Sequence, residues 1–140
     1  MKTSCVLCHP SPEETIILQR EKWRVILAGD AAFPGFCRVI WKNHVTEMTD
    51  LTPPERAELL NAVFSVEQAI RDVMRPDKVN LASLGNMAPH LHWHVIPRFA
   101  DDTHFPESVW GKAQREPDNA TLEKRRALLP ELKAAIRRIP

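Results

Sequence analysis

The sequence predicts an α+β domain: a mostly antiparallel five-stranded sheet, one long helix packed on it, and a further helix near the C-terminus. Three observations support this class. Short apolar runs near the N-terminus are joined by links of hairpin length, a long segment carries apolar residues at helical spacing, and two more strand-like runs follow it. Strands before and after one long helix, with short links, are typical of an antiparallel α+β fold.

The first three strands are expected at residues 16–18, 23–27 and 36–41. A two-residue turn at 21–22 forms the tip of a hairpin between the first two, and a loop with glycine and proline at 29–35 precedes the third. Because consecutive strands with short links pair with each other, these segments should form an antiparallel meander.

Residues 50–75 are expected to form the principal helix. Thr52 suits the N-cap, prolines occupy the first helical positions, and Glu55 lies close to the positive end of the helix dipole. Pro76 ends the helix. Apolar residues recur at helical spacing and define the face that should pack on the sheet: Leu59, Leu60, Val63, Phe64, Ile70, Val73 and Met74.

A fourth strand is expected at 79–84 and a fifth at 90–96, where the run H-L-H-W-H-V-I holds three of the six histidines of the chain. Pro89 and Pro97 flank this run, and a central strand should not continue through proline, which lacks the N–H of the ladder. We therefore expect the fifth strand to end before Pro97.

Side chains alternate between the two faces of a strand, so His90, His92 and His94 should share one face and the apolar residues between them the other. Three interpretations compete for the histidine face: solvated surface, a metal site, or acid–base and nucleophilic chemistry. Alternate residues lie about 6.5–7 Å apart, so all three histidines are hard to bring to one ion. A division of labour is easier, in which the outer histidine serves a metal and the inner ones a substrate.

The region after residue 99 is polar, with a charged helix expected to begin near Asn119 or Thr121 and to be interrupted or kinked at Pro130. The whole chain, 1–140, is expected to be a single domain with a core at about 5–98 and a C-terminal extension at 99–140.

A formal net charge of +1 argues against nucleic acid as the main partner, which would call for a basic patch or stripe. No run of eighteen apolar residues suggests a membrane span, and the N-terminus lacks an apolar run of signal-peptide length. We therefore expect a cytoplasmic, reducing location. There the three cysteines are thiols or metal ligands rather than disulfides, and Cys37 is interpreted as a small buried hydrophobe.

Cys5 and Cys8 form a C-x-x-C motif, whose thiolates are typical zinc ligands. His44, just after the third expected strand, and His90 would complete a closed and therefore structural Cys2His2 site. The alternative is that both cysteines are unpaired thiols. We expect no organic cofactor.

His92, at the centre of the histidine face, remains free of metal in this arrangement. An imidazole nitrogen is a good nucleophile toward phosphorus at neutral pH when an acceptor holds the other ring nitrogen protonated. The position of His92 suits this role.

The run at 90–96 resembles the pattern His-φ-His-φ-His-φ-φ, with φ apolar, of the histidine triad (HIT) superfamily. The resemblance covers about residues 5–98. The segment from His104 to Trp110 is similar to a bacterial branch of small HIT hydrolases. Further matching positions are Pro34-Gly35, Asn43-His44, Asp50-Leu51 and Ile96-Pro97-Arg98.

This resemblance implies an HIT-like fold in which His92 attacks the α-phosphate of a nucleotide and forms a nucleotidyl-histidine intermediate. His90 would orient His92 through its backbone carbonyl, and its ring would bind metal with the C-x-x-C motif and His44. His94 would lie by the phosphates and help the leaving group depart.

Substrate contacts are expected from three further residues. Asn86 stands where many members carry a glutamine that contacts phosphate, and Gly85 allows close backbone approach. The nucleoside would lie in a cleft beside the loop before the third strand, with Asp30 accepting from ribose hydroxyls or, alternatively, solvated. Phe36 departs from the pattern, since many members carry histidine there.

The leading interpretation is a nucleotide hydrolase or nucleotidyl transferase acting on dinucleoside polyphosphates, nucleoside phosphoramidates or similar conjugates. Two alternatives are a non-catalytic nucleotide-binding module and a zinc-dependent hydrolase that uses a metal-bound water. The resemblance also implies a homodimer formed by joining sheets edge to edge.

Overall fold

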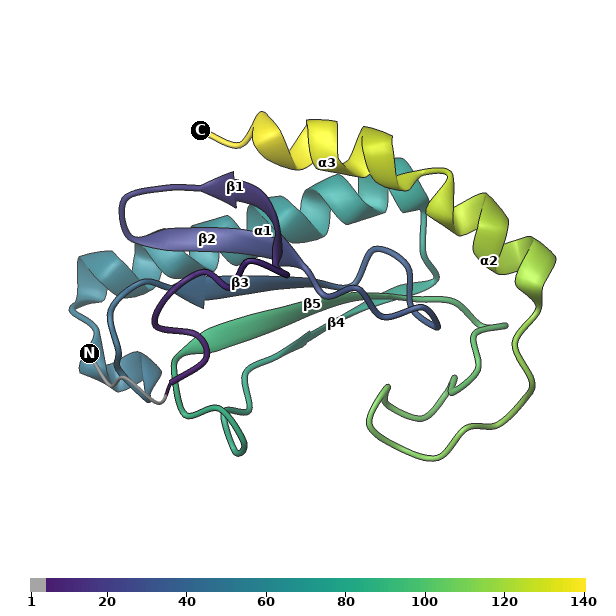
Figure 1. The fold of residues 1–140 in the computed structure, drawn as a ribbon, viewed down its shortest axis with the longest axis horizontal. Coiled ribbons are helices and arrows are strands. Elements are labelled where there is room, and N and C mark those ends of the chain that lie inside the picture. Colours follow the sequence, from purple (N-terminus) through teal and green to yellow (C-terminus); the bar gives the residue numbers. More distant parts are fainter. Residues whose placement is uncertain (1–4) are drawn as a thin grey trace.

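The computed structural model describes residues 5–140 and shows an antiparallel sheet with helices on one face (Figure 1). The strand order is β1-β2-β3-β5-β4, and every neighbouring pair is antiparallel. The predicted fold class is confirmed. The strands are β1 (Thr15–Gln19), β2 (Trp23–Leu27), β3 (Cys37–Trp41), β4 (Lys78–Ala82) and β5 (His92–Arg98).

The long helix α1 (Pro53–Met74) begins with a capping box. The Thr52 hydroxyl accepts the backbone N–H of Glu55, and the Glu55 carboxylate accepts the backbone N–H of Thr52 at 2.9 Å. The helix ends at Arg75, which adopts the left-handed conformation. The predicted helix began too early, because a separate 3₁₀ turn, η1 (Met48–Asp50), precedes the cap.

The buried face of α1 packs on the sheet and on the C-terminal helix. Phe64, predicted to lie on this face, is instead 51% exposed. Ala62 and Ala69 belong to the buried face, although the periodicity of large apolar residues did not include them. Small side chains such as alanine let a helix lie close to a sheet. The buried residues are Leu59, Ala62, Val63, Val66, Ala69, Ile70 and Met74.

The C-terminal helix is interrupted, as predicted, and consists of α2 (Asn119–Arg126) and α3 (Leu129–Arg137). The break precedes Pro130, which lies in the first turn of α3, where its missing N–H leaves no helical bond unmade. Helix α3 packs on α1 and β1 and buries Leu132 and Ile136.

The histidine strand β5 differs from the prediction at both ends. It begins at His92 rather than His90, and it runs through Pro97 to Arg98. Pairing with β3 stops at Val95, so beyond that residue β5 has only β4 as a neighbour, with Val79 opposite Pro97. A proline there interrupts no ladder on the β3 side. Strand β4 likewise ends two residues earlier than the predicted 84.

Register places the polar residues of the sheet on the face away from α1. Arg38 of β3 lies opposite His94 of β5, and Ile40 lies opposite His92. Paired residues share a face, so these side chains stand together. The N-terminal segment crosses this face and is fixed by Arg24, whose guanidinium pairs with Glu14 at 2.9 Å and donates to the Leu7 carbonyl.

Across the part of the chain that the structure describes, no helix is both long enough and apolar enough to cross a membrane.

Candidate functional site

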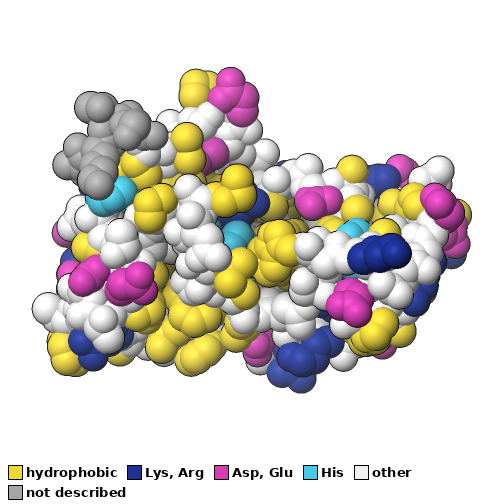
Figure 2. Space-filling model, turned by 90° about the horizontal axis from the view of Figure 1, so that it is seen from below, with side chains coloured by type: hydrophobic (Ala, Val, Ile, Leu, Met, Phe, Trp, Pro, Cys, Tyr) yellow, Lys and Arg dark blue, Asp and Glu magenta, His cyan; other side chains and the backbone are white. Residues whose placement is uncertain are grey.

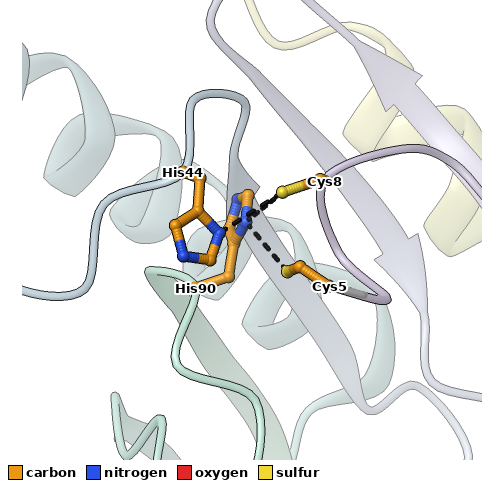
Figure 3. A group of neighbouring side chains, drawn as sticks. All are labelled: Cys5, Cys8, His44 and His90. Atoms are coloured by element: carbon orange, nitrogen blue, oxygen red, sulfur yellow. Dashed lines mark hydrogen bonds between the residues drawn. The ribbon is translucent and has the colours of Figure 1, made fainter. Parts of the chain in front are cut away.

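Four side chains from three separate segments meet at one end of the sheet (Figure 3). Cys5 and Cys8 come from the N-terminal segment, His44 from the loop after β3, and His90 from the residues just before β5. Their ligand atoms all lie within 4.8 Å of one another. The Cys8 Sγ is 3.3 Å from His44 Nδ1 and 3.6 Å from His90 Nδ1, and the Cys5 Sγ is 3.5 Å from His90 Nδ1.

These separations fit a tetrahedral metal site. With metal–sulfur bonds of about 2.3 Å and metal–nitrogen bonds of about 2.0–2.1 Å, a sulfur–nitrogen edge is about 3.6 Å. His90 Nε2 lies 2.5 Å from the Trp41 carbonyl oxygen. Because a carbonyl only accepts, Nε2 carries the hydrogen and Nδ1 keeps its lone pair for a metal. The predicted quartet is therefore brought together in a geometry that could hold a metal ion.

The ring of His92 is oriented by the backbone of His90. Its Nδ1 donates to the His90 carbonyl oxygen at 2.6 Å, so Nε2 carries the lone pair of the neutral ring. The side chain is buried. Burial lowers the pKa of His92, and the charge of Arg38 adds to this effect, while the bond to the His90 carbonyl opposes it. The imidazole is therefore neutral at pH 7.

His94 lies against His92, with ring centroids 4.9 Å apart. Aromatic rings enclose it on other sides: Trp110 at 5.0 Å and Phe36 at 5.6 Å. Burial, with the nearby His92 and Arg38, lowers the pKa of His94 to about 4. Its Nδ1 is buried and has no hydrogen-bond partner among residues 5–140. The ring is thus neutral at pH 7, with hydrogen-bonding capacity that the described chain does not use.

His92 and His94 line a cavity of about 450 Å³. Figure 2 shows a histidine in a hollow bordered by hydrophobic side chains. The volume falls within the range of about 300–1,000 Å³ that is usual for small-molecule sites. The other lining residues are Val6, Leu7, Arg38, Leu84, Gly85, Asn86, Met87, Ala88 and Trp110.

The rim of this cavity is unusually apolar for an exposed surface. Of the large hydrophobic side chains that are exposed among the described residues, only Phe64 lies elsewhere. Val6, Leu84, Met87 and Trp110 all line the cavity, and Met87 is 99% exposed. Contiguous exposed apolar surface of this kind is typical of a binding site.

Trp110 belongs to the segment after β5, which a buried ion pair holds in place. Arg98 donates to both carboxylate oxygens of Asp102, at 2.9 and 3.1 Å, and to the Glu107 carbonyl. The Asp102 carboxylate in turn accepts backbone N–H groups of this segment, from Phe99, His104 and Phe105.

The remaining predicted contacts divide between two cavities. Gly85 and Asn86 line the cavity of His92. Asp30 instead lines a smaller cavity of about 160 Å³ beside the loop before β3, together with Phe36 and Arg126. Its carboxylate accepts the backbone N–H of Ala32 at 3.0 Å. The predicted cleft beside this loop is therefore separate from the cavity that holds His92.

Sequence reasoning missed Arg38 as a residue of the site. It is the one charged residue in the apolar run 36–41 and shares its strand face with Phe36 and Ile40. A charge at an alternate position of a buried strand is the signal that could have identified it.

The fold and site define an α+β domain in which the interior strand β5 presents buried imidazoles to a cavity, beside a Cys/His cluster. The model of the HIT domain matches residues 10–101. The chain belongs to the HIT domain family, as its resemblance to the histidine triad pattern predicted.

Two curated relatives illustrate the family. The chain is 32% identical over 108 residues to an AP-4-A phosphorylase of Mycobacterium tuberculosis, a match that covers 72% of this chain and 55% of the relative. It is 31% identical over 91 residues to an asymmetrical bis(5'-nucleosyl)-tetraphosphatase of Schizosaccharomyces pombe, covering 61% and 50%. The chain thus spans about half the length of these relatives.

Solved structures of bacterial family members share the fold. A histidine triad protein from Bradyrhizobium japonicum has a TM-score of 0.68 and 28% identity, covering 84% of this chain and 89% of that one. One from Marinobacter aquaeolei has a TM-score of 0.69 and 26% identity, covering 88% and 90%. A Zn-bound family member from Mycobacterium smegmatis has a TM-score of 0.63 and 26% identity, covering 94% and 97%.

Proposed function

We propose that this protein is a nucleotide hydrolase or nucleotidyl transferase in which His92 attacks the α-phosphate of its substrate. One observation carries the proposal: His92 Nδ1 donates to the His90 carbonyl at 2.6 Å. This bond fixes the tautomer and leaves Nε2 as the nucleophilic nitrogen of a ring that lines the main cavity.

The reaction has two steps. His92 Nε2 bonds to the α-phosphorus while the bond from phosphorus to the leaving group breaks, and the leaving group takes the electron pair. Water then attacks the phosphorus and gives up a proton to solvent, the bond to Nε2 breaks with its electron pair returning to the nitrogen, and the nucleoside monophosphate leaves. Throughout, the His90 carbonyl accepts the Nδ1 hydrogen and stabilises the positive charge of the nucleotidyl-imidazole.

Three neighbours are proposed to help. His94 touches His92 and lines the same cavity, which suits a hydrogen bond from its ring to the leaving group. Asn86 and Gly85 line the same cavity and would contact phosphate oxygens. Asp30 would contact ribose if the nucleoside extends past Phe36, which lines the smaller cavity and touches His94.

The proposed substrates are dinucleoside polyphosphates or nucleoside phosphoramidates. The names of the curated relatives, an AP-4-A phosphorylase and a bis(5'-nucleosyl)-tetraphosphatase, favour the first class. The cavity of about 450 Å³ with an apolar rim is compatible with a nucleotide conjugate.

We further propose that the Cys5, Cys8, His44 and His90 cluster binds structural zinc, supported by its sulfur–nitrogen separations and by the Zn-bound relative. Two thiolates and two imidazoles would complete the coordination shell and leave no open position for a reacting water. Bound there, zinc would tie the N-terminal segment to the start of β5.

The homodimer inferred from the family resemblance stays a prediction. In the sheet order β4 is an edge strand, with β5 as its neighbour on one side. Light scattering during size-exclusion chromatography measures the oligomeric state directly.

The central experiment traps the covalent intermediate. Protein is mixed with diadenosine tetraphosphate labelled at the α-phosphates, or with labelled adenosine phosphoramidate, and quenched in acid. Label should remain on the wild type and be absent from His92→Ala. Equal labelling of both proteins would remove His92 as the nucleophile. Binding of nucleotide with no label and no turnover in the wild type would instead identify a nucleotide-binding module.

A further inference from the structure

Arg38 is the only lysine or arginine among the described residues that line the cavity of His92 and His94. Register pairs it with His94 across β3 and β5, so its side chain stands on the same face of the sheet. The side chain is half-buried, and its guanidinium carbon lies 5.5 Å from the centre of the Phe36 ring. The cavity therefore has one fixed positive charge, held over an aromatic ring.

Arg38 differs from Arg24, the neighbouring arginine on the same face of the sheet, in having no ion-pair partner among the described residues. Arg24 is buried, and its Nε and Nη2 donate to the two Glu14 oxygens at 3.1 and 2.9 Å. Arg38 has no such partner, because the ion pairs within residues 5–140 are made by Arg24, Arg98, Arg125 and Arg126. Asp30 and Glu14 affect Arg38 only through longer-range electrostatic attraction.

A half-buried guanidinium without a hydrogen-bonded anion is costly, since it has lost part of its hydration and gained no ligand. His94, which lines the same cavity, also has a ring nitrogen, its buried Nδ1, without a hydrogen-bond partner among residues 5–140. Arg38 and His94 thus both have polar groups without a hydrogen-bond partner among the described residues, and of the two the half-buried guanidinium is the one that a ligand in the cavity can reach.

We propose that Arg38 binds the nonbridging oxygens of the phosphate that His92 attacks, an inference that rests on the proposed function. The planar guanidinium can donate two parallel N–H groups to a phosphate, which an ammonium cannot reproduce. Phosphoryl transfer depends on positioning and on stabilising charge on these oxygens, and Arg38 is the only lysine or arginine among the described residues that line this cavity. Arg38 is therefore the group that supplies positive charge where the phosphate lies.

Isothermal titration calorimetry with AMP and adenosine as probes tests this assignment on the zinc-loaded protein. Both probes lack the leaving group of the proposed substrates, so the result does not depend on turnover. Wild type should prefer AMP over adenosine. Arg38→Gln should weaken AMP binding about 10- to 100-fold, the usual range for losing hydrogen bonds to a charged group, and leave adenosine binding unchanged. Arg38→Lys should retain part of the preference.

Arg126 provides the matched comparison, because it lies on the smaller cavity and also has an unpartnered guanidinium nitrogen. Arg126→Gln should leave the preference for AMP intact. The assignment is overturned if wild type binds AMP and adenosine equally, if Arg38→Gln keeps the wild-type preference, or if the preference is lost in Arg126→Gln instead. Covalent labelling of His92 is a separate measurement, so failure of the proposed chemistry and failure of the Arg38 assignment can be told apart.

Discussion

The carbonyl oxygen of His90 lies 2.6 Å from Nδ1 of His92, while the ring of His90 belongs to the Cys/His cluster. One residue therefore links the two parts of the site. Its side chain contacts Cys5 and Cys8, and its backbone aims the proposed nucleophile. If the cluster is disrupted, the His90 carbonyl should shift, and the His92 ring that donates to it should then lose its fixed orientation.

Disrupting the cluster with Cys8→Ser should abolish stoichiometric zinc binding and destabilise the fold. A ligand present at about a thousand times its Kd stabilises the folded state by about 4 kcal/mol. For a chain of this size, that corresponds to a fall in Tm of about 8–16 °C. Metal content by atomic emission and Tm by scanning calorimetry measure both effects. Labelling of His92 should fall as well, because the His90 backbone is no longer held.

Cys37→Ser is the control for this variant. Cys37 is fully buried at the start of β3, whereas His44 of the cluster follows the end of that strand, and the Cys37 thiol donates to the Gly35 carbonyl. This substitution should lower Tm without changing zinc content. If Cys8→Ser kept its zinc, the cluster would not be the metal site. If chelation of folded wild type stopped turnover before it lowered stability, the zinc-dependent hydrolase would be the better interpretation.

The buried His94 should make stability depend on pH. Burial, with His92 and Arg38 nearby, lowers its pKa from the ordinary 6.5 to about 4. Between these values the unfolded chain binds a proton that the folded protein does not, so stability rises with pH. The contribution is fully present above the unfolded pKa and is lost as the pH falls toward the folded one.

The His94→Gln variant, which cannot titrate, should therefore show a smaller fall in Tm than wild type between about pH 7.5 and pH 4.5. Tm is measured at constant ionic strength. Protonation of the Cys/His cluster affects both proteins and cancels in the comparison. Parallel profiles for the two proteins would show that His94 is not held neutral by the fold.

The fold was largely predictable because its signals are local. The capping box at Thr52 and Glu55 and the short links between the first strands are each contained within a few residues. The end of β5 was not predictable in this way. Whether Pro97 is tolerated depends on β3, which stops pairing at Val95, and this is a property of the assembled sheet.

The site was predictable to a different degree for each residue type. Cysteine and histidine at these spacings have few common roles besides metal binding and catalysis, so the cluster and His92 could be predicted from the sequence. Arg38 left only the weak signal of a charge within an apolar strand, and Trp110 left none, because only the fold brings these two residues to His94. Asp30 was predicted to contact ribose in a cleft beside the loop before the third strand; it lines a cavity beside that loop, and its contact with substrate stays a prediction.

Trp110 should contribute to binding of the leaving group. It is half-exposed on the cavity rim and packs against His94, which is proposed to lie by the leaving group. Stacking of a base on an aromatic side chain contributes about 1–3 kcal/mol. Trp110→Ala should therefore raise KM for diadenosine tetraphosphate about 5- to 150-fold. The increase should be smaller for adenosine phosphoramidate, whose leaving group has no base.

The conservative variant Trp110→Phe keeps an aromatic ring and should retain most of the wild-type KM. The ratio of the two substrates' kcat/KM values, compared across both variants, separates stacking from general damage to the site. An equal loss for the two substrates in Trp110→Ala would contradict a specific contact with the second base.

The buried pair of Arg98 and Asp102 should stabilise the segment that carries Trp110. Both side chains are at most 3% exposed, and the Asp102 carboxylate also accepts three backbone N–H groups. Removing one partner leaves a buried charge uncompensated, so Asp102→Asn should cost about 3–5 kcal/mol in urea denaturation. Glu123 pairs with Arg126 at 3.4 Å but is 75% exposed. Glu123→Gln should therefore cost about 1 kcal/mol at most, and similar losses in the two variants would show that burial does not set the strength of the Arg98–Asp102 pair.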